Sequence, residues 1–327
     1  MKANTVSIEY IGELDSKTIT NDLRSAKYSI IESFGFHQMK KEMSKIGTAC
    51  RLVLWYSEKT AKKKGNRGHN LRKAMSRLLD WGAPSKVRGF FPHVRTGFVF
   101  GFNHPTLGEI LRLVSICFTE YPDRKYLFPV NIAWYEELAP VAERLEAFGL
   151  YITPIVTPSA KEKLSEGLGE ESMHIIDNLA RKFNNDYLAL CDAFIANNDI
   201  VMVAPTAGRQ STVFKSYAHY LAKEKIEPAT MTLVAMSLIR LGNFNFHFIP
   251  LAILPPKRHS PGLNLFKVYT ILPGIWISPS SVRELCKKKN KITNQRAFEH
   301  YFLHAIADDM LRLGGRKMVY PLNNSKE

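Results

Sequence analysis

The sequence has few cysteines, no long apolar run and no low-complexity segment. Its four cysteines lie far apart, whereas a zinc site or a redox dithiol needs closely spaced pairs. Scattered single thiols are typical of a reducing cytosol. No segment approaches the ~20 apolar residues of a membrane span, and the N-terminus lacks the apolar core of a secretory signal. We therefore expect a cytoplasmic protein that would meet lipids only peripherally, at the inner face of a membrane.

Acidic residues are scarce relative to basic ones. The 327-residue chain has 45 Lys and Arg against 30 Asp and Glu, a net charge of +15. Such an excess predicts an anionic partner: nucleic acid, an anionic membrane surface, a phosphorylated substrate or an acidic carrier protein. A hydrophobic content of 45% is ordinary for a folded protein, and this length predicts one or two domains.

Nucleic acid is the partner that the sequence favours least. The basic runs at 62–64 and 287–291 lack the interleaved aromatic residues of a base-stacking platform, and no known nucleic-acid module is recognisable. No nucleic-acid partner is therefore expected. A non-catalytic basic binding protein remains an alternative, and each basic run also fits an ordinary solvated surface.

Hydrophobic periodicity predicts two domains. Helical spacing through residues such as Leu52 and Trp55 indicates a smaller helical N-terminal domain, residues 1–82, with a basic loop at 62–69. After the punctuating residues at 81–85, short apolar runs alternate with amphipathic segments. This alternation predicts an α/β domain, residues 83–327, with a layered mixed, largely parallel sheet flanked by helices. The expected strands are 94–102, 125–130, 150–156, 199–204, 246–254 and 267–272, and the expected helices are 107–120, 134–148, 170–196, 212–225 and 297–313.

Residues 97–109 are the most informative stretch. A short aromatic strand runs into Asn103-His104-Pro105, and Thr106 can cap a helix that carries Glu109 in its first turn. Histidine is well suited to act as a base near neutral pH, and a nearby carboxylate can fix its tautomer. An alternative is purely structural, because Thr106 and Glu109 also have the spacing of a capping box.

A second motif follows the apolar strand expected at 199–204. Residues 205–211 form a loop of small residues with one arginine, Arg209, in which backbone N–H groups and the guanidinium could hold an anion. Taken alone, this loop fits a solvated arginine equally well.

Together, the two motifs resemble the first and third signature blocks of the glycerolipid acyltransferases. That family has a histidine and an acidic residue separated by four positions, then a Pro-x-Gly-x-Arg-like loop about a hundred residues later. Residues 248–253 resemble its fourth block, a proline-containing apolar strand. The closest likeness is to the soluble plastid-type glycerol-3-phosphate acyltransferases, over roughly residues 85–275.

The resemblance implies acyl transfer from acyl-CoA or acyl carrier protein to glycerol-3-phosphate or a lysophospholipid, without a metal or other cofactor. It implies a catalytic base, His104, supported by Glu109, and an acceptor site with Arg209, Gly208 and Thr206. Residues Lys125 and Lys161 are candidates for the basic residue of the second block. Glu109 replaces the commoner aspartate, and Ser211 replaces a second arginine. A glycolipid acceptor is therefore an alternative.

Overall fold

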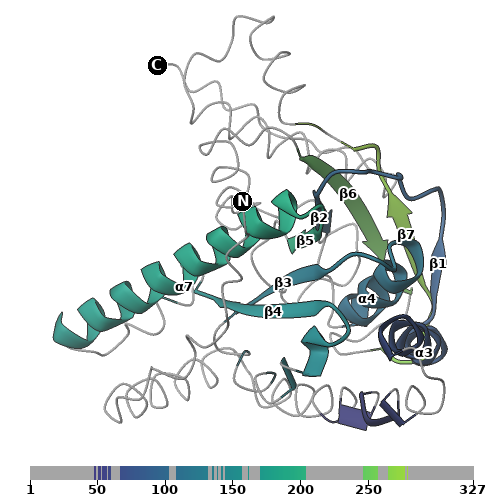
Figure 1. The fold of residues 1–327 in the computed structure, drawn as a ribbon, viewed down its shortest axis with the longest axis horizontal. Coiled ribbons are helices and arrows are strands. Elements are labelled where there is room, and N and C mark those ends of the chain that lie inside the picture. Colours follow the sequence, from purple (N-terminus) through teal and green to yellow (C-terminus); the bar gives the residue numbers. More distant parts are fainter. Residues whose placement is uncertain are drawn as a thin grey trace, which may run out of the picture.

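The computed structural model describes a mixed sheet covered by helices on both faces (Figure 1). The described residues are 67–102, 108–131, 144–156, 170–203, 246–256 and 264–276, with single positions between 48 and 59 and at 135, 138, 141, 142, 161 and 278. Within them, the α/β class and the largely parallel sheet predicted from the sequence are confirmed.

Seven strands form the sheet in the order β1-β7-β6-β2-β5-β3-β4. The five strands from β6 to β4 run parallel, and β7 pairs antiparallel with β6 and parallel with the edge strand β1. β1 and β7 therefore run opposite to the other five strands. The bounds are β1 Ser85–Val87, β2 Phe98–Phe102, β3 Tyr126–Asn131, β4 Leu150–Ile155, β5 Ile200–Val203, β6 His247–Leu254 and β7 Tyr269–Pro273.

Helices cover the two faces of the sheet separately. Helix α4 (Gly108–Glu120) packs on one face with α3 (Arg67–Gly82) beside it, and α7 (Glu170–Ala196) packs against β3, β4 and β5. The face under α4 carries every second residue of β2 and β5, including Phe100 and Met202, in one hydrophobic cluster. Because side chains alternate across a strand, Val99 and Val201 point to the opposite face, and both are fully buried.

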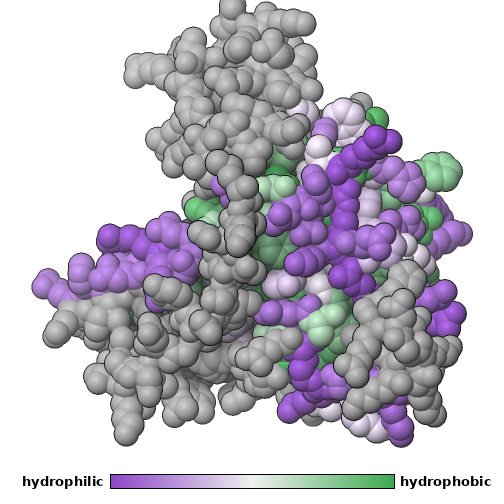
Figure 2. All heavy atoms as spheres, in the orientation of Figure 1, coloured by the Kyte–Doolittle hydropathy of each residue, from purple (hydrophilic) through white to green (hydrophobic). Residues whose placement is uncertain are grey.

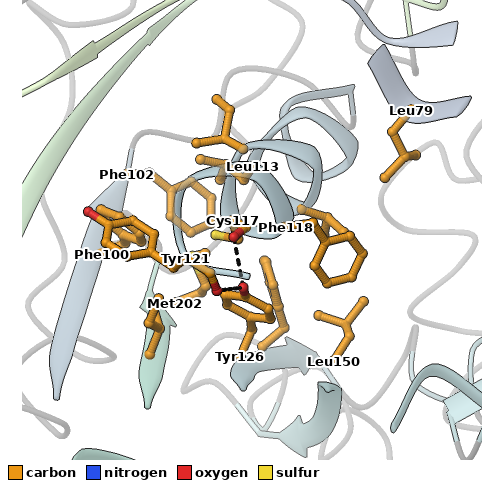
Figure 3. Packing of buried hydrophobic residues seen from close by; sticks show 14 of the residues in the cluster. Leu79, Phe100, Phe102, Leu113, Cys117, Phe118, Tyr121, Tyr126, Leu150 and Met202 are labelled. Atoms are coloured by element: carbon orange, nitrogen blue, oxygen red, sulfur yellow. Dashed lines mark hydrogen bonds between the residues drawn. The ribbon is translucent and has the colours of Figure 1, made fainter. Parts of the chain in front are cut away.

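Aromatic side chains make up the centre of the core beneath α4 (Figure 3). The Tyr126 hydroxyl donates to the carbonyl oxygen of Cys117 at 2.7 Å and also contacts the carbonyl of Tyr121. Burial raises the pKa of this hydroxyl well above its ordinary value. It therefore remains a donor, and these contacts fasten β3 to the C-terminal end of α4.

All six expected strands are found, but the first begins later than predicted. Residues 94–97 precede β2, and two of their carbonyl groups accept hydrogen bonds from a side chain: Arg124 Nη1 donates to Thr96 O at 2.7 Å and Nη2 donates to Val94 O. Strand β1 was not predicted, since three residues are too few to show a period of two.

Helix α3 corrects the predicted basic loop at 62–69, because the helix already begins at Arg67. Gly68 lowers the stability of this helix by only about 1 kcal/mol relative to alanine, and the packing of α3 on α4 can offset that loss. The expected helix 170–196 is confirmed as α7, and the described residues between 135 and 146 are helical. The expected helices at 212–225 and 297–313 lie outside the described residues.

Most of the predicted N-terminal domain also lies outside the described residues. Its described positions between 48 and 59 are helical; Leu54 is buried in the core, whereas Leu52 and Trp55 are exposed. Met75 of α3 belongs to the same hydrophobic cluster as the sheet. The domain boundary at 82 and 83 stays a prediction.

None of the helices in the described ranges is both long and apolar enough to cross a membrane.

Gly97 allows the last turn of α7 to approach β2 closely. A Cβ atom at this position would overlap the backbone oxygen, Cα and carbonyl carbon of Ile195. We expect Gly97→Ala to lower the free energy of unfolding by about 1–3 kcal/mol, because two backbones would have to separate. Urea unfolding measures this. Gly82→Ala is the matched control, since a Cβ atom at that position would have nothing within 4 Å; equal stability of the two variants would contradict the argument.

Candidate active site

Two of the sequence motifs start from the same edge of the sheet. Strands β2 and β5 are neighbours, parallel and in register, with Phe98 opposite Ile200 and Gly101 opposite Val203. The chain therefore leaves β2 after Phe102 and β5 after Val203 side by side. In open α/β sheets, ligands bind outside the carboxyl ends of the strands, and this edge is our candidate active site.

Strand β6 completes this part of the sheet on the other side of β2. The apolar segment 248–253, expected as a proline-containing strand, lies in β6 and pairs in parallel with β2. Residues Phe248, Ile249 and Leu251 are fully buried. The segment thus supports the site through packing and supplies no polar group to it.

Glu109 lies in the first turn of α4, and its side chain is fully buried. A carboxylate near a helix N-terminus interacts favourably with the helix dipole. Full burial is unusual for glutamate unless the charge is compensated. A cationic residue that interacts electrostatically with Glu109 lies one turn further along the same helix.

That residue is Arg112, which is also fully buried. Its guanidinium donates to four backbone carbonyl groups and lies 3.8 Å from the centroid of the Tyr269 ring. The hydrogen bonds are Nε to Pro84 O at 3.2 Å, Nη1 to Gly108 O at 2.6 Å, and Nη2 to Asn264 O at 3.0 Å and Lys267 O at 2.7 Å.

These contacts make Arg112 the link between α4, the segment before β1 and the segment before β7. Burial lowers the pKa of its guanidinium, while electrostatic interactions with Tyr269 and Glu109 oppose that change. Arginine nevertheless stays charged. Arg112 therefore places a fixed cation near Glu109 at the start of α4.

Sequence reasoning missed Arg112, although a signal was present. A single arginine interrupts the apolar run 110–114 of the predicted helix, three positions after Glu109. Residues three apart lie on the same side of a helix. A charge inside an apolar helix face with an acidic residue one turn earlier indicates a buried charge pair.

The other residues of the first and third blocks lie outside the described residues. These are His104 and Thr106 after β2, and Thr206, Gly208 and Arg209 after β5. In sequence, His104 is the second residue after β2, and Thr206 is the third after β5. Whether Glu109 forms a capping box with Thr106 or orients His104 stays a matter of prediction.

The structure does not bring Lys125 to the candidate edge. Lys125 directly precedes β3, whose first residue pairs with the first residue of β5. Its backbone N–H donates to Asp199 Oδ1 at 2.8 Å, and its Nζ lies 5.7 Å from the centroid of the Tyr151 ring. Lys125 therefore lies at the amino ends of the strands, the opposite edge from α4's first turn.

Lys161 follows β4, the strand at the far side of the sheet. Its Nζ lies 2.7 Å from Asp177 Oδ1 of α7, and this hydrogen bond lowers the pKa of the Asp177 carboxyl group. Strands β5 and β3 separate β4 from β2. The contact of Lys161 with α7 fits a partly exposed ion pair, and the structure does not bring it together with Glu109.

Within the described part of the chain, no three His, Cys, Asp or Glu side chains form a group that could hold a metal ion. No protein-family model matches the chain, and no curated protein matches it in sequence.

Proposed function

We propose that this chain is an O-acyltransferase related to the glycerolipid acyltransferases. It would move an acyl group from acyl-CoA or acyl carrier protein to a hydroxyl group of glycerol-3-phosphate or a lysophospholipid. One observation carries the proposal: β2 and β5 are adjacent and in register, so the histidine block and the arginine loop start from one sheet edge. A helical N-terminal domain and a peripheral location at the inner membrane face belong to the same proposal.

In the proposed reaction, His104 is the general base. It takes the proton from the acceptor hydroxyl as the oxygen attacks the thioester carbonyl carbon. The tetrahedral intermediate then collapses, the C–S bond breaks, and the proton passes from His104 to the departing thiolate. Glu109 would hold the imidazole in the accepting tautomer and stabilise its cation, as the aspartate does in serine hydrolases.

Arg112 also helps to hold Glu109 in position. Its four hydrogen bonds to backbone carbonyl groups fix the first turn of α4 against the segments before β1 and β7. A base oriented by a fixed carboxylate loses little activity to misalignment. Backbone N–H groups at the start of α4, or those of Thr206 and Gly208, would stabilise the oxyanion.

The acceptor site is proposed at the loop after β5. A guanidinium binds two phosphate oxygens at once, and Arg209 is the arginine that the resemblance places there. We leave Lys125 out of this site because it lies at the opposite edge of the sheet. Lys161, which contacts Asp177, is not needed for it either.

The direct test is release of free thiol from palmitoyl-CoA and from palmitoyl acyl carrier protein by the purified full chain. Glycerol-3-phosphate, lysophosphatidate and a lipid A precursor are offered in turn as acceptors. Release that depends on an acceptor supports the proposal and ranks the acceptors. No release with any donor and acceptor pair would overturn it in favour of a non-catalytic basic binding protein.

Arg209→Ala should act mainly on acceptor binding. We expect KM for a phosphorylated acceptor to rise about 10- to 100-fold with a smaller change in kcat, because a charge-assisted pair contributes about 1.5–3 kcal/mol. Steady-state kinetics with varied acceptor measure this. Arg181→Ala, an exposed arginine of α7, is the matched control. An equal loss with a phosphate-free acceptor would remove Arg209 from the proposed role.

A further inference from the structure

Exposed apolar side chains gather along one edge of the sheet. Of the twelve large hydrophobic side chains that are exposed among the described residues, eight belong to two segments, 81–90 and 264–276. These segments contain β1 and β7, which pair with each other. In Figure 2, hydrophobic and hydrophilic atoms lie side by side at the right-hand margin, where Figure 1 places β1 and β7.

We define the edge patch as three apolar residues at each end of β1. Trp81, Phe266 and Val268 lie at one end, and Val87, Phe90 and Ile275 lie at the other. Phe90 is 95% exposed and Ile275 is 83% exposed. Strands rise about 3.3 Å per residue, so the two groups are on the order of 10 Å apart along β1.

Backbone contacts hold the patch in place. The Phe266 N–H donates to Gly82 O at 2.8 Å, and the Phe266 ring meets the Trp81 ring edge to face at 5.1 Å. At the other end, Arg88 N–H donates to Ile271 O at 2.9 Å. These aromatic side chains are therefore exposed on an ordered part of the fold.

The charged side chains within the two segments are all basic, although exposed Asp80 directly precedes Trp81. Segments 81–90 and 264–276 include Lys86, Arg88 and Lys267, all exposed, and no acidic residue. Exposed apolar side chains with polar residues around them often mark an interaction site. Tryptophan and phenylalanine beside basic residues match the interface of a bilayer, where aromatic rings lie at headgroup level and basic groups meet anionic lipids.

We infer that the edge patch docks this protein on the surface of an anionic lipid bilayer, with the apolar side chains entering the headgroup region and the three basic residues contacting lipid phosphates. A neutral protein partner would not require this one-sided charge. The inference rests on the proposed function only for the purpose of docking, which would be to bring the protein to its lipid substrates. Binding itself needs no turnover.

The test is co-sedimentation of the full chain with vesicles of phosphatidylcholine alone and of phosphatidylcholine mixed with phosphatidylglycerol. Wild type should bind the anionic vesicles, and less so as salt rises. The double variant Phe90→Ser/Ile275→Ser should bind at least about tenfold more weakly. Met173→Ser, an exposed apolar residue of α7, is the matched control and should bind like wild type.

Charge is tested separately. Lys86→Gln/Arg88→Gln should weaken binding to anionic vesicles by about fivefold per charge, whereas Arg181→Gln should not. Circular dichroism and the unfolding midpoint report whether each variant is folded. Wild-type affinity in the Phe90/Ile275 variant, or no wild-type binding to anionic vesicles, would overturn the inference.

A second outcome would also overturn it. If wild type forms dimers in sedimentation equilibrium, and the Phe90/Ile275 variant is monomeric while vesicle binding is absent, the patch joins two copies of the chain through β1. The vesicle and thiol-release assays are independent, so failure of docking and failure of acyl transfer are distinguishable.

Discussion

His104→Ala is expected to lower kcat for acceptor-dependent thiol release by about 10²- to 10⁴-fold, the usual contribution of a positioned general base. The thermal unfolding midpoint should stay close to that of wild type. The reason is chemical: without the imidazole, the proposed mechanism has no group that titrates near neutral pH to take the hydroxyl proton. Stopped assays of free thiol with saturating donor and acceptor measure the change.

His93→Ala is the matched control, because His93 is exposed and precedes β2. It should retain wild-type kcat. A wild-type kcat in His104→Ala would show that His104 is not the general base and would overturn the proposed mechanism.

Glu109→Gln tests whether the two residues act as a unit. If Glu109 orients His104, the single variants and the double variant should lose similar amounts of activity, since residues of one catalytic unit are not additive. If the loss of activity in the double variant instead equals the product of the two single losses, Glu109 does not act through His104 and has a structural role at the start of α4. Unfolding curves are needed beside the rates, because Glu109 is fully buried.

The second large effect is expected on stability. Arg112→Leu should lower the free energy of unfolding by about 3–5 kcal/mol, since it leaves four backbone carbonyl groups without this donor and removes a cation that interacts electrostatically with Glu109. Four backbone acceptors and the Tyr269 ring lose their contact together. Guanidinium chloride unfolding, followed by far-UV circular dichroism, measures the loss.

Two variants separate the causes of that loss. Arg112→Leu made in a Glu109→Gln background should cost less stability than in wild type, because the neutral amide has no charge interaction with Arg112 to lose. Arg112→Lys should be intermediate, since it keeps the charge but loses the fork of donors. Arg77→Leu, at an exposed position of α3, is the matched control. Equal free energies of unfolding for the Arg77→Leu and Arg112→Leu variants would contradict the argument.

The six expected strands and α7 were predictable because each has a hydrophobic pattern that is visible in the local sequence. Apolar runs such as 199–204, bounded by polar or small residues, indicate buried strands, and the long amphipathic pattern at 170–196 indicates a helix. Strand β1 was not predictable, since its three residues belong to the sheet only through β7. The residues before β2 bond to Arg124, which is distant in sequence.

Individual site residues were harder to predict than the edge that carries them. Lys125 was a candidate for the basic residue of the second block, but a position in the sequence does not say at which end of the sheet that residue will lie. Arg112 contributes the cation beside Glu109, yet its acceptors come from three separate segments. Local patterns do not reveal which carbonyl groups a buried guanidinium will meet.

The acceptors of Arg112 also have a consequence for folding on the ribosome. Two of its hydrogen bonds go to carbonyl groups 152 and 155 positions further along the chain. During synthesis, these groups emerge long after α4, and β1 likewise has to wait for β7 before it can pair. Contacts between such distant positions form late. A nascent chain that has completed β5 therefore still lacks two of the four carbonyl acceptors of Arg112 and the strand that pairs with β1.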